Sequence, residues 1–509
     1  MNTILEQFQD KINGTFSFFD RMIIKGHVRQ FFSPSGKNHF LSHNNVLLMD
    51  FSAYAAQVTA SIVSHVETLT ASLDRPLVYL PSSRTSKEQT AREILSASPV
   101  EEGLICTLST VEYCSTLQPV KQQDGKLALA NVNRKCKYYY FYFQDMEFGF
   151  MHVKLQTWFP FQIQVYINGR ELMKHVFDQN GITYSMYDNS FTEISDIEKS
   201  QKLADRFDSK KLCRQLDHFA YRLNPYLDAI NDSFGQGYLW CVDQCEYATD
   251  VMFKSREALE EIYPSLVEHA FYDFKCTDVF SFLGRKLSNK FQGEVVSDYR
   301  KRPEGWRVKH RMKSNSIKMY DKFNCLRIEM TINDPKEFKV YKEVRHKDGT
   351  SSMRWSPMGK SISNLYRYAE VSRSANLRYL SALQGIIPKQ SVEREINGIC
   401  TKKKSDGRIY TGFNVWEKGT FELFEELSNG SYLIRGFTNK DIRRALYRKA
   451  EADEKANRNR ITRLFGKLRA HGLVKKVPHS LRYLVTEKGR RVMGALIETK
   501  KRTYTELAA

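Results

Sequence analysis

The sequence lacks several features that would assign it to a common class of protein. No apolar run approaches the roughly 18 residues that span a membrane, and the start MNTILEQFQDKING has no basic region followed by an apolar one. The nine cysteines are scattered, and the one close pair, Cys241 and Cys245, has no second pair at the spacing of a zinc site. We therefore expect a cytoplasmic protein with reduced thiols and no membrane partner.

Several catalytic signatures are also missing. The sequence contains no glycine loop that would cradle phosphates, no nucleophile elbow and no HExxH zinc motif. It also contains no internal repeat. The phrase SSRTSKEQTAREI places Lys87 in the first turn of an expected helix, where an anion could bind, but the phrase is not a Walker motif.

Basic residues are abundant and unevenly distributed. The 509 residues include 78 Lys and Arg against 58 Asp and Glu, a net charge of +20. The segment 438–503 alone holds 20 basic and 6 acidic residues, so 14 of the 20 excess charges lie there. A polyanion is the partner that such a segment favours. We expect DNA, with RNA as the alternative.

The pattern of apolar residues predicts an α+β multidomain protein. Residues 1–195 form an α/β domain whose stretch YYYFYFQDMEFGFMHVKLQTWFPFQIQVYING predicts an antiparallel β-meander. Residues 196–388 form a central domain of helices and a β-hairpin, residues 389–408 a linker, and residues 409–509 a C-terminal domain.

Within the central domain, WCVDQCEYATDVMF has apolar residues at helical spacing. On such a helix Asp243, Glu246 and Asp250 would share one face, either as a metal-binding set or as a partner for basic segments.

The stretch IKMYDKFNCLRIEMTI, residues 317–332, has period-two alternation on both sides of a short turn. One face of the expected hairpin is apolar, and the other carries Lys318, Tyr320, Lys322, Arg327 and Glu329. The polar face could be an active site, a nucleic-acid surface or a solvent-facing set of cross-strand ion pairs.

The residues Lys318, Tyr320, Asp321, Lys322, Leu326, Arg327 and Glu329 resemble a strand pair in rolling-circle replication initiators of phages and plasmids. The resemblance implies a tyrosine that attacks a DNA phosphate beside a divalent metal, with Tyr320, Glu329 and Asp321 as the catalytic residues. None of the twelve histidines stands in a His-x-His pair, the usual metal-ligand set of the main initiator class, so the sequence departs from that class here. The basic phrase RVKHRMK lies just upstream, and we expect Lys309, Arg311 and Lys318 to contact nucleic acid.

A second candidate metal site lies in the meander. Asp145 and Glu147 share parity around a turn, and His152 follows on the next strand. Such a set could bind Mg²⁺ or Mn²⁺ for phosphodiester chemistry, whereas the simpler interpretation is an acidic turn before an amphipathic strand.

The C-terminal domain has the clearest order of elements. A helix, a short extended piece, a helix opened by a capping box at Thr438 and Asp441, a longer basic helix, two short strands and a final helix follow one another. RITRLFGKLRAHGLVKKVPHSLRYLVTEKGR resembles the winged-helix domains of MarR-type transcription regulators. The resemblance implies a recognition helix with Arg458, Arg460, Arg463 and Lys467, and a wing with Lys475, Lys476 and Arg482 against phosphate.

These expectations favour a nucleic-acid-binding protein of a mobile element or replicon that recognises a DNA site and nicks or transfers strands with Mg²⁺ or Mn²⁺. One alternative is a transcription regulator whose large body senses a ligand or forms a homodimer. Another is a non-catalytic RNA-binding protein that uses the aromatic run YYYFYF for stacking.

Overall fold

The computed structural model describes residues 4–82, 84–285, 293–302, 305–346, 348–383, 392–405, 407–428, 432, 436–447, 454–478 and 480–501. The chain divides into two compact units. Unit 1 comprises residues 1–261 and 276–382, and unit 2 comprises residues 262–275 and 383–509. Among the described residues, no helix is both long and apolar enough to cross a membrane.

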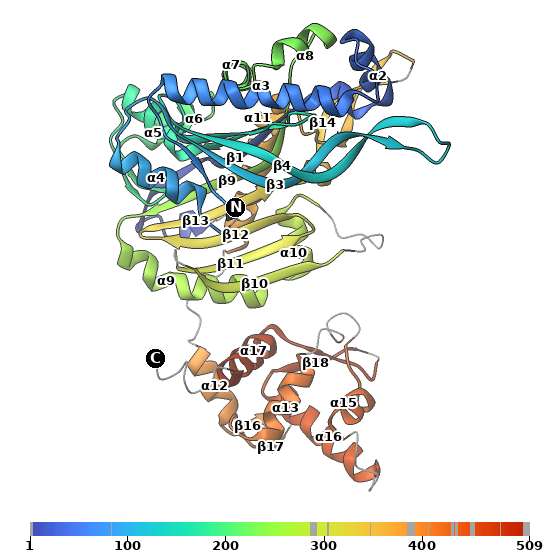
Figure 1. The fold of residues 1–509 in the computed structure, drawn as a ribbon. Helices are drawn as coiled ribbons and strands as arrows, with labels where there is room; N and C mark the ends of the chain where they lie inside the picture. Colours follow the sequence, from blue (N-terminus) through green and yellow to red (C-terminus); the bar gives the residue numbers. More distant parts are fainter. Residues whose placement is uncertain are drawn as a thin grey trace. The chain divides into compact units, whose positions relative to one another are not determined.

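Unit 1 is built on one sheet of eleven strands, in which every described pair is antiparallel except β2–β3. The strands are, in spatial order, β10 (Val295–Arg302), β11 (Gly305–Met312), β12 (Asn315–Lys322), β13 (Cys325–Ile332), β9 (Leu239–Phe253), β1 (Ile12–His27), β6 (Ile163–Asn168), β5 (Gly149–Gln156), β4 (Leu127–Asp145), β3 (Gly103–Lys121) and β2 (Leu77–Tyr79). Figure 1 shows the long β3–β4 hairpin projecting beyond the rest of the sheet.

The expected division of the body at residue 195 is not where the chain divides. Strand β1 pairs with β6 on one side and with β9 on the other, so residues 1–195 and 196–388 contribute to one sheet. The expected meander is present as β4, β5 and β6. Residues 389–391 and 406 of the expected linker lie outside the described residues, and α12, β16 and the start of β17 occupy most of the remainder.

The remaining elements of unit 1 are helices and two short hairpins. They are α1 (Ile4–Gln7), η1 (Arg29–Phe32), α2 (Pro34–His43), α3 (Phe51–Ser72), α4 (Lys87–Ala97), α5 (Gly169–Gln179), β7 (Tyr184–Tyr187), β8 (Ser190–Ile194), α6 (Ile197–Ala204), α7 (Ser209–Leu223), α8 (Leu227–Phe234), α9 (Arg256–Glu268, which ends in unit 2), α10 (Cys276–Phe282), η3 (Pro335–Glu337), β14 (Lys339–Arg345), β15 (Ser351–Pro357), η4 (Ile362–Asn364) and α11 (Leu365–Ala382).

The two faces of the sheet have different cover. Helices α3 and α11 pack on one face, where Thr70 meets Thr107 and Asn376 donates to the Tyr247 carbonyl and to Thr249. We call this the helix-covered face (Figure 1). The opposite parity of the strands forms the site face, which we define by Arg21 on β1, Glu246 on β9, Glu329 on β13 and Lys318 on β12.

One expected helix is a strand, and this expectation was wrong. WCVDQCEYATDVMF lies in β9, which pairs with β1 and β13 along most of its length. Its apolar residues lie at spacings that suit a helix, but a central strand with both faces covered is also apolar at most positions. Local periodicity therefore could not separate the two structures.

Unit 2 consists of short helices around a core that includes Leu423, Phe424, Ile442, Ile461 and Phe465. Its elements are η2 (His269–Asp273), α12 (Val392–Cys400), β16 (Lys403–Ser405), β17 (Arg408–Tyr410), α13 (Lys418–Leu427), α15 (Asn439–Leu446), α16 (Glu454–Ala470), β18 (Val474–Lys476), β19 (Tyr483–Val485) and α17 (Glu487–Lys501). The expected capping box is present, because Thr438 and Asp441 satisfy each other's backbone N–H groups at the start of α15.

Candidate active site on the site face of unit 1

Three carboxylates meet at the centre of the large sheet. Asp20 on β1, Glu246 on β9 and Glu329 on β13 each offer an oxygen, and these oxygens lie within 4.8 Å of one another. Among the described residues this is the only group of three or more acidic, histidine or cysteine side chains close enough to share a metal ion. The three strands are neighbours in space but come from distant parts of the sequence.

A β-bulge brings Asp20 into this group. Phe19 pairs with Tyr247 and Arg21 pairs with Glu246, so Asp20 is the extra residue between the two pairs. A bulge interrupts the strict alternation of a strand, so Asp20 and its neighbour Arg21 can both serve the site face. Arg21 donates to Glu246 Oε1 at 2.7 Å, and Asp20 Oδ1 accepts from Asn189 at 2.9 Å.

The hairpin of β12 and β13 supplies the rest of the site. Lys318 lies directly opposite Glu329, and Tyr320 lies opposite Arg327. The Lys318 ammonium donates to Glu329 Oε1 at 2.5 Å and lies 3.5 Å from Glu246 Oε1. The Tyr320 hydroxyl donates to the other Glu329 oxygen at 2.5 Å. One tyrosine and one lysine thus bind the same carboxylate.

This polar face is buried, which excludes the interpretation of solvent-facing ion pairs. Glu329 and Arg327 are each 1% exposed, and Tyr320 is 6% exposed. The cluster reaches solvent beside Arg21, whose side chain is 36% exposed. Surface pairs of this kind would contribute little to stability, whereas buried ones must be matched closely because an unpaired charge there is costly.

Two buried arginines complete the electrostatics. Arg327 donates to both oxygens of Asp250, to Asp20 Oδ1 and to the Asn189 carbonyl, at 2.6 to 2.9 Å. Arg170, at the start of α5, is fully buried and lies 3.1 Å from Asp250 and 3.5 Å from Asp20. With Lys318 and Arg21, four basic groups balance four carboxylates.

The pKa shifts follow from this arrangement. Burial opposes the charged form of Glu329, but Lys318 and the hydrogen bonds from Lys318 and Tyr320 lower its pKa to about 2. Burial and the neighbouring Glu329 charge raise the pKa of Glu246. Burial and the same Glu329 charge raise the pKa of Tyr320 well above its usual value. The free site therefore holds one firmly ionised carboxylate, one that protonates more readily, and a neutral tyrosine.

The structure does not bring Asp321 to this group. Asp321 has the opposite strand parity, and a Cβ atom added to Gly305 would lie 2.5 Å from its Oδ1. Lys322 is buried and pairs with Asp188 on the β7–β8 turn.

The expected set of Asp145, Glu147 and His152 is not assembled either. Asp145 accepts hydrogen bonds from the backbone of Glu147 and Phe148, as in an ordinary acidic turn. Glu147 pairs with Lys211 at 2.9 Å and with Gln215. His152 stacks on Tyr166 with ring centroids 5.1 Å apart, and burial together with Lys154 and Lys87 lowers its pKa to about 4.

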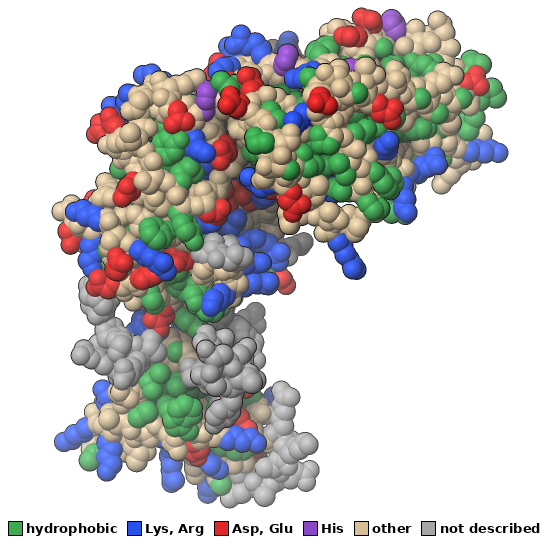
Figure 2. All heavy atoms as spheres, turned by 60° about the vertical axis from the view of Figure 1, so that its left-hand side comes forward, with side chains coloured by type: hydrophobic (Ala, Val, Ile, Leu, Met, Phe, Trp, Pro, Cys, Tyr) green, Lys and Arg blue, Asp and Glu red, His purple; other side chains and the backbone are tan. Residues whose placement is uncertain are grey.

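Basic side chains continue from the site toward the sheet edge. Lys309 on β11 lies opposite Lys318, and Arg307 and Arg311 have the same parity. Burial and the neighbouring charges of Lys318, Arg307 and Arg311 lower the pKa of Lys309, which indicates concentrated positive charge. In the view of Figure 2, Lys and Arg side chains of unit 1 form a dense group beside acidic ones, and other basic side chains are scattered over the surface.

The expected recognition residues of unit 2 lie on α16 and the following strands. Arg458, Arg460 and Arg463 are exposed on α16, and Lys475, Lys476 and Arg482 are exposed on or beside β18 and β19. Lys467 differs, because its ammonium lies 4.2 Å from the centre of the Phe413 ring and burial lowers its pKa.

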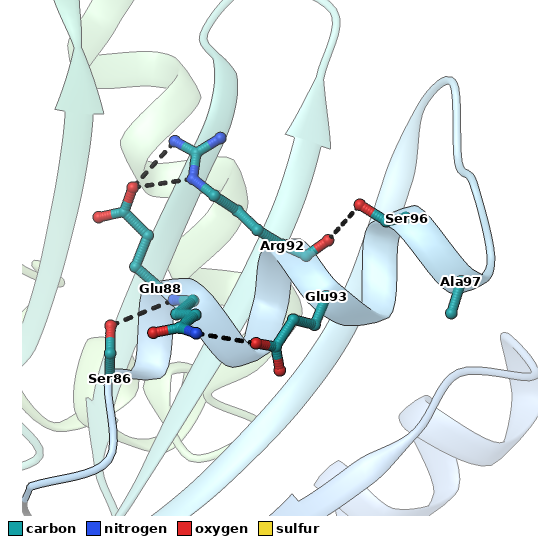
Figure 3. A pocket seen from close by; sticks show the side chains of 7 residues that line it. Ser86, Glu88, Arg92, Glu93, Ser96 and Ala97 are labelled. Carbon is teal, nitrogen blue, oxygen red and sulfur yellow. Dashed lines mark hydrogen bonds and ion pairs between the residues drawn. The ribbon is translucent and has the colours of Figure 1, made fainter.

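A surface hollow along α4 is a weaker candidate. Its lining side chains pair mainly with one another, because Glu88 binds Arg92, Gln89 donates to Glu93, and Ser96 donates to the Arg92 carbonyl (Figure 3). Ser86 caps the helix by accepting from the Gln89 N–H. The hollow is thus an ordinary helix surface.

Sequence reasoning found Lys318, Tyr320 and Glu329 but missed Asp20, and it placed Glu246 on the wrong kind of element. The local signal for Asp20 was its place as the single acidic residue in the largely apolar run INGTFSFFDRMIIKGH. Searches with protein-family models, against curated proteins and against solved structures find no match to this chain.

Proposed function

We propose that this protein processes DNA strands with a divalent metal ion, as a component of a mobile element or replicon. The observation that carries the proposal is the group of Asp20, Glu246 and Glu329 with the Tyr320 hydroxyl bound to one of its carboxylates. A tyrosine beside three carboxylates and a lysine supplies a nucleophile, metal ligands and a positive charge, which phosphodiester cleavage can use.

The donor set fits Mg²⁺ or Mn²⁺. All three side chains offer oxygen, the ligand that these hard cations prefer, and no histidine or cysteine lies in the group. When bound, the metal would polarise a phosphate and stabilise the negative charge that develops on it. Since the four carboxylates are already balanced by basic groups, the metal adds positive charge that a DNA phosphate can offset. We therefore expect metal and DNA to bind more tightly together than separately.

The chain's own residues supply the remaining chemistry. The Tyr320 oxygen attacks phosphorus, the bond from phosphorus to one ester oxygen breaks, and the proton that Tyr320 loses ends on that leaving oxygen. Glu329 Oε2 accepts the Tyr320 hydrogen bond in the free protein and orients the hydroxyl, but its low pKa makes it a poor final acceptor of the proton. Lys318 and Arg21 lie where they can hold the phosphate oxygens. Because Tyr320 is 6% exposed, its hydroxyl must turn from Glu329 toward the DNA for this attack.

That burial favours a second candidate, hydrolysis by a metal-activated water with Tyr320 as a positioning group. The two reactions differ in one product. Attack by Tyr320 leaves DNA covalently joined to the protein, whereas hydrolysis leaves none.

We also propose that unit 2 recognises a DNA site as a winged helix. Its order of helices and the β18–β19 pair supports this, as do the exposed arginines on α16. In such an arrangement α16 enters the major groove and the two strands lie against phosphate.

The test is strand cleavage of the DNA that copurifies with the protein, with Mg²⁺, Mn²⁺ or EDTA. Glu329→Gln and Asp20→Asn should abolish cleavage and keep DNA binding, while Tyr320→Phe should abolish the covalent adduct. Asp243→Asn is the matched control, because Asp243 is also a β9 carboxylate but pairs with Lys25 outside the triad. If Glu329→Gln cuts at the full rate, the site is wrong. An intact palindromic duplex bound by a homodimer would indicate a regulator, and copurifying RNA would indicate an RNA-binding protein.

A further inference from the structure

The β14–β15 hairpin lies outside the large sheet and exposes one entire face. On that face β14 carries Tyr341 and β15 carries Met353 and Trp355, with Tyr341 directly opposite Trp355. These side chains are 54%, 53% and 67% exposed, and the two aromatic rings lie 5.8 Å apart. A group of large apolar side chains kept in water on a hairpin marks a contact surface.

The charge of the hairpin indicates the kind of partner. Residues 339–357 include five Lys and Arg and two Asp and Glu, a net charge of +3. The two acidic side chains are used locally, since Glu343 accepts from Ser351 and Asp348 accepts from Thr350. Among the described residues, Lys339, Lys342, Arg345 and Arg354 form no ion pair.

Two of these basic residues lie on the aromatic face itself. Lys339 and Arg345 have the same strand parity as Tyr341 and lie on the aromatic face, whereas Lys342 and Arg354 lie opposite each other on the other face. A polyanion that lies along the aromatic face therefore meets Lys339 and Arg345.

We propose that the β14–β15 hairpin binds single-stranded nucleic acid, with bases stacked on Trp355 and Tyr341 and phosphates held by Lys339 and Arg345 on the same face. An unpaired base offers a free face for stacking, whereas the bases of a duplex are stacked on one another. A basic surface with exposed aromatic rings is the combination that single strands require. The proposal is independent of any chemistry at Tyr320.

The test is fluorescence anisotropy of the full-length protein with a labelled oligo(dT) strand, in EDTA so that no cleavage occurs. We expect Trp355→Ala to weaken binding about 10-fold, while Trp355→Phe keeps most of the affinity because the ring still stacks. Tyr79→Ala is the matched control, since Tyr79 is 58% exposed on the edge strand β2 of the same unit. Lys339→Gln and Arg345→Gln should each reduce the slope of log Kd against log salt by about 0.7, whereas Lys342→Gln and Arg354→Gln, on the other face, should change it less.

Unchanged oligo(dT) affinity in the Trp355→Ala, Tyr341→Ala double variant would overturn the proposal. So would a loss confined to self-association or to binding of anionic lipid vesicles, since a protein or a membrane would then be the partner. Because the assay contains no metal, loss of affinity in this variant supports the hairpin site even if no strand cleavage is ever observed.

Discussion

Replacing Arg327 by Met is the sharpest test of the buried charge network. Methionine has a similar length and no charge, so Arg327→Met removes four hydrogen bonds and leaves Asp20 and Asp250 facing Arg170 alone. The remaining arginine cannot replace the lost contacts, because its nitrogens form no aligned hydrogen bond with either carboxylate.

The magnitude follows from burial. Removing one partner of a buried ion pair costs about 3–5 kcal/mol, because the other charge stays buried without compensation. Spread over the roughly 370 residues of unit 1, at about 2.1 cal/mol/K of unfolding entropy per residue, a loss of about 4 kcal/mol lowers Tm by about 5 °C.

The assay is thermal unfolding followed by circular dichroism. Arg373→Met is the matched control, because Arg373 pairs with Asp205 in a half-exposed ion pair whose loss should cost at most about 1 kcal/mol. Adding Asp250→Asn to Arg327→Met should recover part of the lost stability, because it removes one uncompensated charge. If Arg327→Met is no more destabilising than the control, the carboxylates are not buried charges and the reasoning fails.

Four further predictions concern pH, folding and DNA binding. Because the pKa of Glu246 is raised, protons compete with a metal for this carboxylate at pH values above the usual pKa of glutamate. The Mn²⁺ affinity measured by calorimetry should therefore rise with pH until the pKa of Glu246 is passed and then level off. An affinity that does not change across the acidic range would contradict this. The stability that the lowered pKa of Glu329 provides should be complete above about pH 4.5 and be lost as pH falls toward about 2, and Glu329→Gln should remove this acid-sensitive part of the unfolding profile. In unit 2, Thr438→Ala should lower the free energy of unfolding by about 1 kcal/mol because the capping box is lost, whereas Thr438→Ser should keep it. Arg463→Gln should lower the slope of log Kd against log salt for duplex DNA by about 0.9. Lys467→Gln should change this slope less, because the Lys467 ammonium lies over the Phe413 ring.

Local patterns predicted much of the secondary structure. The hairpin at residues 317–332, the meander and the four helices α13, α15, α16 and α17 were expected and are present, because each depends on alternation, turns or caps within a short segment; α12 was not expected, since it lies in the predicted linker. The strand β9 was not recognised, because its burial depends on neighbours that are far away in the sequence.

The candidate site could be predicted only in part for the same reason. Tyr320, Lys318 and Glu329 come from one hairpin, so the sequence could place them together. Asp20 joins them through pairing between β1 and β9, across more than 200 residues, and through a bulge that no local pattern marks. The set of Asp145, Glu147 and His152 shows the converse, since neighbours in sequence there use their polar groups in separate contacts.

The cost of the buried charges is itself an argument for function. A sheet of this size is stabilised at least as well by apolar residues at its centre, and replacing buried ion pairs by well-packed apolar side chains is often neutral or stabilising. Here Arg327 and Arg170 each lie between Asp20 and Asp250, while Lys318 and Arg21 hold the two glutamates. Arg327 and Arg170 lie on the buried side of the cluster, whereas Lys318 and Arg21 lie on the side that reaches solvent. Only Lys318 and Arg21 can therefore give up their contacts with Glu329 and Glu246 to an incoming cation.

Lys318→Met should therefore leave a site that binds Mn²⁺ more tightly than the unaltered protein, because the ammonium group that competes with the metal for Glu329 is gone. Titration with Mn²⁺ followed by electron paramagnetic resonance measures this directly. Weaker binding in that variant would show that Lys318 shapes the site rather than occupying the place of the metal.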